Sequence, residues 1–205
     1  MLRAAQRRPT ANRATTAAQA RMRITATITC LLSFAGVSWG ALRFFTKPSG
    51  LTKRAAVVGG LGAFFGIWTV AATWLSTSPW GQLLAATILH LASSLLFWSA
   101  VRACRSVPLT AIFEPDPPVR IILTGPYRYV LHPFYLSYTV FWASGWIASP
   151  SWVSFAGVAV MLAIYLRAAR NEERKFATSS LAGDYREYRR QVRGMPPRPR
   201  TLSTL

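Results

Sequence analysis

Acidic residues are scarce in this 205-residue chain: 6 Asp and Glu stand against 24 Lys and Arg, and Glu114 is the first acid. Charged residues of either sign make up only 15% of the sequence, whereas soluble domains carry about 25%. Cysteine is limited to Cys30 and Cys104, too few for a disulfide framework and too far apart for metal-ligand spacing. Neither a GxGxxG fingerprint nor a P-loop occurs. These absences exclude a disulfide-stapled domain and a P-loop nucleotide site, and they argue against a soluble protein.

Long apolar runs are the main feature of the sequence. Hydrophobic residues make up 52% of the chain, and charge-poor runs alternate with short basic clusters, as in membrane proteins. Residues 24–45, 55–75 and 80–101 each supply about 20 residues, enough to cross ~30 Å of hydrocarbon. His90 falls near the middle of the third run, where we expect a neutral ring bonded to a neighbouring helix.

Two shorter apolar segments, 134–148 and 152–167, flank the turn Ser149-Pro150-Ser151 and predict an antiparallel helical hairpin. Because the arms are nearly equal in length, the polar end of the second arm should return to the start of the first. The residues expected to meet are Arg167, Arg170, Glu172 and Glu173 on one arm and His132, Pro133 and Tyr135 on the other.

The sequence therefore predicts an all-α polytopic membrane protein with about five transmembrane helices and a C-terminal helical hairpin. Residues 181–193 follow the hairpin, with Tyr185, Tyr188 and Val192 on one helical face and arginines on the other. This pattern predicts an amphipathic interfacial helix. Three regions are expected: a disordered basic tail over 1–23, three transmembrane helices over 24–101, and a catalytic region over 102–205.

Basic residues set the expected orientation. From Arg43 onward, 18 Lys and Arg fall on the face of the second linker, the long loop and the C-terminus, which the positive-inside rule makes cytoplasmic. The membrane is then the bacterial inner membrane or, in a eukaryote, the endoplasmic reticulum. The 6 Arg of the tail fall on the opposite side, so we expect translation to start at Met22, which N-terminal sequencing tests. The basic excess suits anionic lipid, and no nucleic-acid partner is expected.

The central stretch is TGPYRYVLHPFYLSY, residues 124–138. Its Gly-Pro pair signals a turn, and Pro133 suits the first position of a helix, which places His132 at the cap beside free N–H groups. A helix start of this kind favours an anionic group. With Glu172 and Glu173 alongside, the site suits a zwitterionic ligand with an amino group and hydroxyls. Nothing in the sequence indicates covalent or metal catalysis.

The motifs GPYRYV at 125–130, HPxY at 132–135, the Glu pair at 172–173 and GDYxxY at 183–188 resemble the isoprenylcysteine carboxyl methyltransferase family. Phospholipid N-methyltransferases share most of these elements. The resemblance covers roughly the last 90 residues and fits the number of spans before them. It implies a membrane-embedded methyltransferase that uses S-adenosylmethionine and a lipid-like or hydrophobic methyl acceptor.

The resemblance also implies residue roles. His132 and Glu172 are the candidate catalytic residues, and His132 is expected to position the cofactor rather than to take a proton. Arg167 or Arg170 is expected to meet the substrate, and no metal is implied. The implied cofactor-binding residues are Val119, Ile121, Ile122, Tyr127, His132, Pro133, Phe134, Tyr135, Glu172 and Glu173.

Several alternatives stay open. Leu131 stands where the family usually has Arg, and Ser137 where it often has Gly. Carboxyl O-methylation is favoured, and lipid amine N-methylation and thiol S-methylation remain alternatives; only an amine must lose a proton. In another class, the chain is a non-catalytic membrane binding or scaffold protein of the same fold. A transporter is disfavoured, because His90 is the one polar group well inside a span. The oligomeric state is open.

Overall fold

A computed structural model describes residues 8–46, 53–105, 109–110 and 120–192. The elements in chain order are α1 (Arg8–Phe44), β1 (Phe45–Thr46), α2 (Lys53–Trp74), α3 (Trp80–Ala103), β2 (Leu109–Thr110), the 3₁₀ turn η1 (Gly125–Arg128), α4 (Pro133–Ala148), α5 (Trp152–Ala177) and α6 (Ala182–Gln191). Within these ranges the only strand pairing is the two-residue parallel contact of β1 with β2. The prediction of an all-α fold is confirmed.

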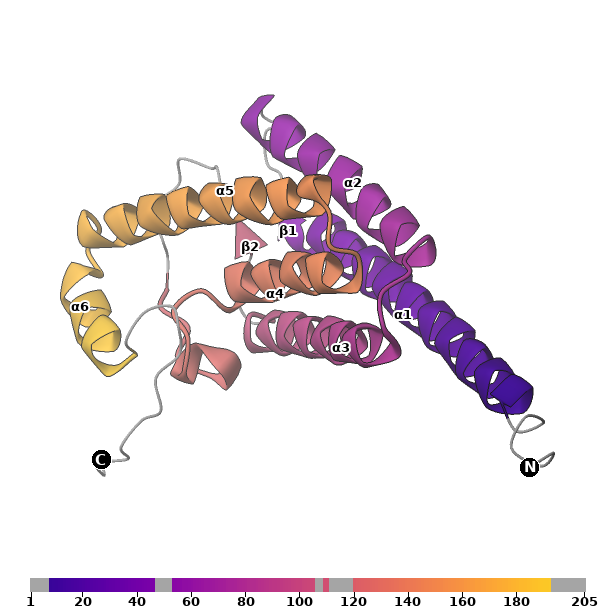
Figure 1. The fold of residues 1–205 in the computed structure, drawn as a ribbon. Helices are drawn as coiled ribbons and strands as arrows, with labels where there is room; N and C mark the ends of the chain where they lie inside the picture. Colours follow the sequence, from indigo (N-terminus) through magenta and orange to yellow (C-terminus); the bar gives the residue numbers. More distant parts are fainter. Residues whose placement is uncertain (1–7, 47–52, 106–108, 111–119, 193–205) are drawn as a thin grey trace.

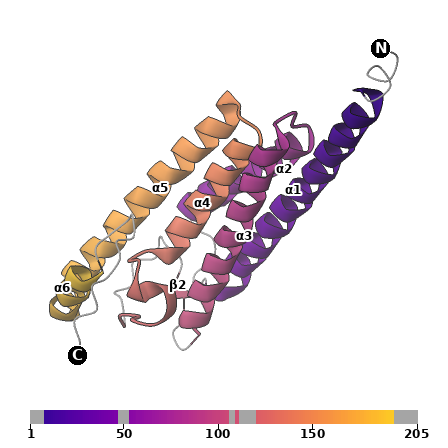
Figure 2. The same cartoon turned by 60° about the horizontal axis from the view of Figure 1, so that its bottom comes forward.

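Helices α1 to α5 form one bundle, and α6 folds back at the end of α5 (Figure 1). Figure 2 shows α1, α3, α4 and α5 running side by side, with the amino end of α1 and the short α6 at opposite ends of the molecule. We call the end with the turns at 75–79 and 149–151 the turn end. The end with α6 and η1 is the site end.

The helix α4 lies at the centre, in contact with α1, α2, α3 and α5. Its 16 residues reach about 24 Å, which is short for a membrane span. Four other segments are long and apolar enough to cross a membrane: Thr16–Phe44, Ala55–Trp74, Trp80–Ala103 and Trp152–Ala177. The bundle thus has four long candidate spans around the short central helix α4. Because its neighbours surround it, little of α4 faces lipid.

The outside of the bundle is apolar. Leu32, Ile67 and Leu95, on three different helices, are each 65–70% exposed, whereas soluble monomers rarely expose large contiguous apolar patches. Exposed tryptophans gather at the turn end, where helices α2 to α5 begin or end: Trp74, Trp80, Trp146 and Trp152. Tryptophan is enriched at membrane–water interfaces. These features indicate an integral membrane protein, and the exposed tryptophans at its turn end are of the kind found at membrane–water interfaces.

The amino-terminal part of the chain differs from the prediction. α1 begins at Arg8, so residues 8–23 continue the helix, whereas the sequence predicted a disordered tail over 1–23; residues 1–7 lie outside the described part. Ala and Arg are strong helix formers, and a helix already formed in the apolar segment extends readily into them. Near the turn end, Gln19 Nε2 donates to the Ser78 carbonyl, and Arg23 lies over the Trp74 ring. These contacts tie the extension to the bundle.

Candidate functional site

The site is built on the turn between α3 and α4. η1 opens at Gly125, whose φ of 58° lies in the left-handed region that favours glycine. A Cβ at this position would also lie only 3.1 Å from the Ala103 Cβ, so the turn packs directly on α3. Pro126 follows within the first turn of η1. The predicted Gly-Pro turn is confirmed.

His132 caps α4, and Pro133 begins the helix, as predicted. The Leu136 N–H donates to the His132 carbonyl at 3.0 Å and closes the first helical turn. The His132 side chain makes no capping hydrogen bond and is only 8% exposed. Its ring is engaged by α5 instead.

Two carboxylates of α5 hold the His132 ring. Nε2 lies 3.2 Å from Glu173 Oε1, and Nδ1 lies 3.5 Å from Glu172 Oε2. The Tyr135 hydroxyl donates to the same Glu172 oxygen at 3.2 Å. The predicted return of the Glu pair to the start of α4 is therefore confirmed.

The carboxylates fix the protonation of His132. Burial by itself lowers its pKa, but the hydrogen bonds and charges of Glu172 and Glu173 outweigh burial and raise the pKa to about 9. The geometry agrees with this direction, because Nε2 lies at hydrogen-bond distance from Glu173 and Nδ1 faces Glu172 at the longer distance of 3.5 Å. A pKa of about 9 favours the imidazolium form of His132 at neutral pH.

The two arginines predicted beside the Glu pair differ in position. α5 continues to Ala177, past the expected end at residue 167, because residues 168–177 are helix formers without Gly or Pro. Arg167 is exposed and, at 100° per residue, lies on the far side of α5 from Glu172. Arg170 is also exposed, but its charge interacts with Glu173. The expected proximity is thus wrong for Arg167 and confirmed for Arg170.

Tyr127 reaches the same region from η1. Its hydroxyl accepts from Cys104 Sγ at 3.4 Å, and its backbone carbonyl accepts from the Tyr188 hydroxyl at 2.8 Å. Burial is the main cause that raises the pKa of Tyr127 well above its ordinary value. The charge and hydrogen bond of Cys104 and then the charge of Glu172 raise it further, so the hydroxyl stays protonated. Tyr127 therefore links α3, η1 and α6 beside the carboxylates.

The helix α6 covers one side of the site. The rings of Phe176 and Tyr185 stack with centroids 4.4 Å apart. The buried cluster beneath α6 consists of Leu131, Tyr185, Tyr188 and Val192. The predicted amphipathic helix is present, and its apolar face packs on the protein because the short connection after α5 folds the helix back. Leu131 belongs to this cluster and anchors α6.

Arg189 of α6 joins the ion pairs: its guanidinium lies 3.2 Å from Glu173 Oε2. Glu173 thus contacts His132 through Oε1 and Arg189 through Oε2. Arg189 and Cys104 were not among the predicted site residues. Arg189 belongs to an arginine-rich run, and spacing alone does not show which member of that run turns toward α5.

The remaining predicted residues are apolar supports. Phe134 and Ile122 belong to the cluster around Phe97 beneath the site, and Ile121 packs under α6. Val119 lies outside the described residues. These positions are compatible with lining a ligand from below, but none adds a polar group.

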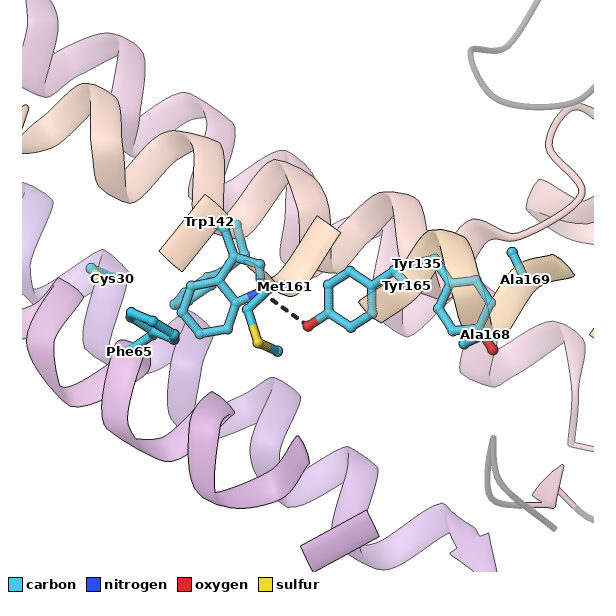
Figure 3. Packing of buried hydrophobic residues seen from close by; sticks show 9 residues of the cluster. Cys30, Phe65, Tyr135, Trp142, Met161, Tyr165, Ala168 and Ala169 are labelled. Carbon is cyan, nitrogen blue, oxygen red and sulfur yellow. Dashed lines mark hydrogen bonds between the residues drawn. The ribbon is translucent and has the colours of Figure 1, made fainter. Parts of the chain in front are cut away.

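A row of aromatic rings leads from the site into the bundle (Figure 3). The rings of His132 and Tyr135 lie 5.4 Å apart, and Tyr135 stacks on Tyr165 at 5.9 Å and 10°. Trp142 Nε1 donates to the Tyr165 hydroxyl at 3.0 Å. The polar groups of the site therefore end on an aromatic layer, with Phe65 and Met161 beyond it.

His90, the other histidine, lies inside the bundle with 0% exposure. Nδ1 is 2.9 Å from the Ala86 carbonyl of its own helix, whereas a neighbouring helix was expected to supply the partner. Within the described part of the chain, Nε2 has no hydrogen-bond partner. The ring meets Phe141 edge-on at 5.2 Å, away from the ion pairs of His132.

No group of three or more His, Cys, Asp or Glu among the described residues is arranged to hold a metal ion. Comparison with protein-family models, curated proteins and solved structures finds no match. Fold and site therefore define a class: an all-α integral membrane protein with a His–Glu ion-pair cluster at one end of its bundle. A more particular function must come from the chemistry of that cluster.

Proposed function

We propose that this protein is an S-adenosylmethionine-dependent methyltransferase for a lipid-like or hydrophobic acceptor. The observation that carries the proposal is the convergence of His132, Tyr135 and Glu172 from two helices. These are the motif residues on which the resemblance to isoprenylcysteine carboxyl methyltransferases rests.

The donor set suits the cofactor, which carries an ammonium group, a carboxylate and ribose hydroxyls. Glu172 is 47% exposed, and both of its contacts with described residues use Oε2. Oε1 is thus left to accept from an ammonium or a hydroxyl. The imidazolium of His132 and the start of α4 favour the carboxylate. When bound, the cofactor supplies an activated methyl group on its sulfonium sulfur.

The protonation of His132 bears on the acceptor. An amine must lose a proton on methylation, and His132, whose pKa the two carboxylates raise to about 9, is a poor acceptor for it at neutral pH. A carboxylate or thiolate attacks without a base, so the role of the residues is to hold the two reactants in line. This supports carboxyl O-methylation over lipid amine N-methylation, with S-methylation as the alternative.

The position of the site suits a lipid-like acceptor. Glu172 and Glu173 lie near the end of α5, one of the four long apolar helices. An acceptor can keep its apolar chain in the bilayer while its polar end reaches the cluster. The same end of the bundle bears Arg128, Arg170 and Arg189, and the positive-inside rule makes it cytoplasmic. Impermeant maleimide should label Thr77→Cys but not Thr178→Cys in intact cells; the reverse pattern would invert this orientation.

Calorimetric binding of S-adenosylmethionine to detergent-purified protein tests the proposal. Wild type should bind, and Glu172→Gln and His132→Ala should each weaken binding at least tenfold, about 1.4 kcal/mol. The matched control is Glu187→Gln, a carboxylate on α6 that is 60% exposed, lies 3.7 Å from Arg190 and accepts a hydrogen bond from Gln191 at 3.1 Å. A folded wild type that binds no cofactor would remove the proposal. Binding without turnover on any acceptor would favour the non-catalytic alternative.

A further inference from the structure

We propose that Arg189 of α6 is a positioning residue that holds Glu173 against His132 and so reserves Glu172 for the ligand. The inference rests on the proposed function only for the ligand with which it is tested. It assigns different roles to two adjacent glutamates that the family resemblance treats as one cofactor-binding pair.

The contacts of the two glutamates differ. Glu173 is 23% exposed and uses both oxygens, with His132 Nε2 at 3.2 Å from Oε1 and Arg189 at 3.2 Å from Oε2. Glu172 is 47% exposed and makes its contacts with His132 and Tyr135 through Oε2 alone. Of the two glutamates, Glu172 alone therefore keeps an oxygen that no described residue contacts.

Arg189 lies on α6, and the packing of this helix against the protein places the Arg189 side chain beside Glu173. Its neighbour Tyr188 is 7% exposed, and the Tyr188 hydroxyl donates to the Tyr127 carbonyl at 2.8 Å. This bond and the cluster around Leu131 fix α6, so the guanidinium starts from a defined backbone position. A planar guanidinium also matches carboxylate geometry better than an ammonium group does.

The charge of Arg189 is a second argument for its positioning role. One imidazolium between two carboxylates leaves a surplus negative charge, which Arg189 offsets in direct contact and Arg170 at longer range. Without Arg189, one oxygen of Glu173 is released. Glu173 can then turn from His132 toward a cationic ligand and compete with Glu172.

The adjacent arginine provides a matched control. Arg190 is 81% exposed and lies 3.7 Å from Glu187, three residues earlier on the same helix. It carries the same charge on the same short element, but its partner is not a member of the cluster. An effect of general surface charge would appear in both arginine variants.

The first experiment is a calorimetric cycle with S-adenosylmethionine on the full chain. Arg189→Gln should weaken binding about tenfold, Arg189→Lys less than threefold, and Arg190→Gln less than twofold. In a Glu173→Gln background, Arg189→Gln should add less than twofold, because its effect acts through Glu173. A full tenfold loss in that background, or wild-type affinity of Arg189→Gln, would overturn the proposal.

A second experiment needs no cofactor. The chain has 2 histidines, so nitrogen-15 histidine labelling gives two ring spin systems, and His90→Leu identifies the His132 signals. Arg189→Gln should make the Nε2–H of His132 exchange with water at least tenfold faster, while the Nδ1–H signal persists. Unchanged exchange would refute the positioning role even if the cofactor binds. Faster exchange in a protein that binds no cofactor would retain the positioning role and reject the proposed function.

Discussion

The two histidines of this chain occupy opposite settings. His90 lies in the middle of the bundle, where its ring makes one hydrogen bond with the described residues, to the Ala86 carbonyl, and has an aromatic neighbour in Phe141. His132 lies at the site end with a carboxylate facing each ring nitrogen. Both rings are buried, so burial does not distinguish them. The carboxylates of α5 do.

The comparison shows that the uncharged hydrogen bonds lie in the middle of the bundle and the charged side chains lie at its site end. Around His90 the polar side chains are satisfied by nearby hydroxyls and carbonyls; for example, Ser93 donates to the Ser137 carbonyl at 2.8 Å. Such bonds join helices and carry no charge. At the site end, charged groups from α5 and α6 meet the cap of α4, and Glu172 remains half-exposed. Ligand chemistry is therefore expected only at the site end.

The largest predicted difference is in pH dependence. The pKa of His132 is raised from 6.5 to about 9. Its ion pairs therefore make their full contribution to the free energy of unfolding below pH 6.5, and this contribution is lost as pH rises through 9. The contribution is at most on the order of 3 kcal/mol. Thermal unfolding in detergent should therefore show wild type losing stability between pH 7 and 9.5 relative to His132→Gln. Parallel pH profiles of the two proteins would show that the ion pairs do not stabilise the fold.

Loosening the site end without touching its charges should give a smaller effect. Leu131→Ala removes a buried anchor of α6, and we expect α6 docking to weaken by about 2 kcal/mol. Hydrogen exchange at the amides of residues 182–191 should accelerate accordingly, while α3 stays protected. Leu95→Ala, at an outward position 70% exposed, is the control. Equal exchange in both variants would mean that Leu131 does not hold α6.

The smallest effect is predicted in the middle of the bundle. His90→Leu removes a ring nitrogen that has no partner among the described residues together with one bond to the same helix. Removing this nitrogen stabilises the fold, whereas losing the hydrogen bond destabilises it. The two effects nearly cancel, and we expect a net stabilisation of about 1 kcal/mol or less. Cofactor affinity by calorimetry should match wild type. A tenfold loss of affinity would extend the functional region into the bundle and remove the contrast between the histidines.

Local sequence signals predict the helices well where they concern a single element. The span predicted at 80–101 corresponds to α3 (Trp80–Ala103), and the proline at the first position of α4 lies as expected. The prediction fails at residues 8–23 and 168–177, where good helix formers extend α1 and α5 beyond their apolar cores. Apolar length therefore gives the spans but not the full helices.

Contacts between elements are predicted less well. The hairpin brings Glu172 and Glu173 to His132, because a tight turn and two arms are enough to fix that end. It does not bring Arg167 there, since side-chain direction depends on the helical phase of α5. The surface covered by α6 and the partner of Arg189 depend on how a short connection folds back. No pattern within residues 181–193 encodes that choice.

The most direct test of the central claim is methyl transfer itself. Purified wild type is given methyl-labelled S-adenosylmethionine and two acceptors with the same apolar chain, one ending in a carboxylate and one in an amine. We predict label in an alkali-labile ester of the carboxylate, none in the amine, and loss of the ester with Glu172→Gln but not with Glu187→Gln. Label found only in the amine would contradict the preference for carboxyl O-methylation. No label in either acceptor, from protein that also binds no cofactor, would contradict the methyltransferase proposal.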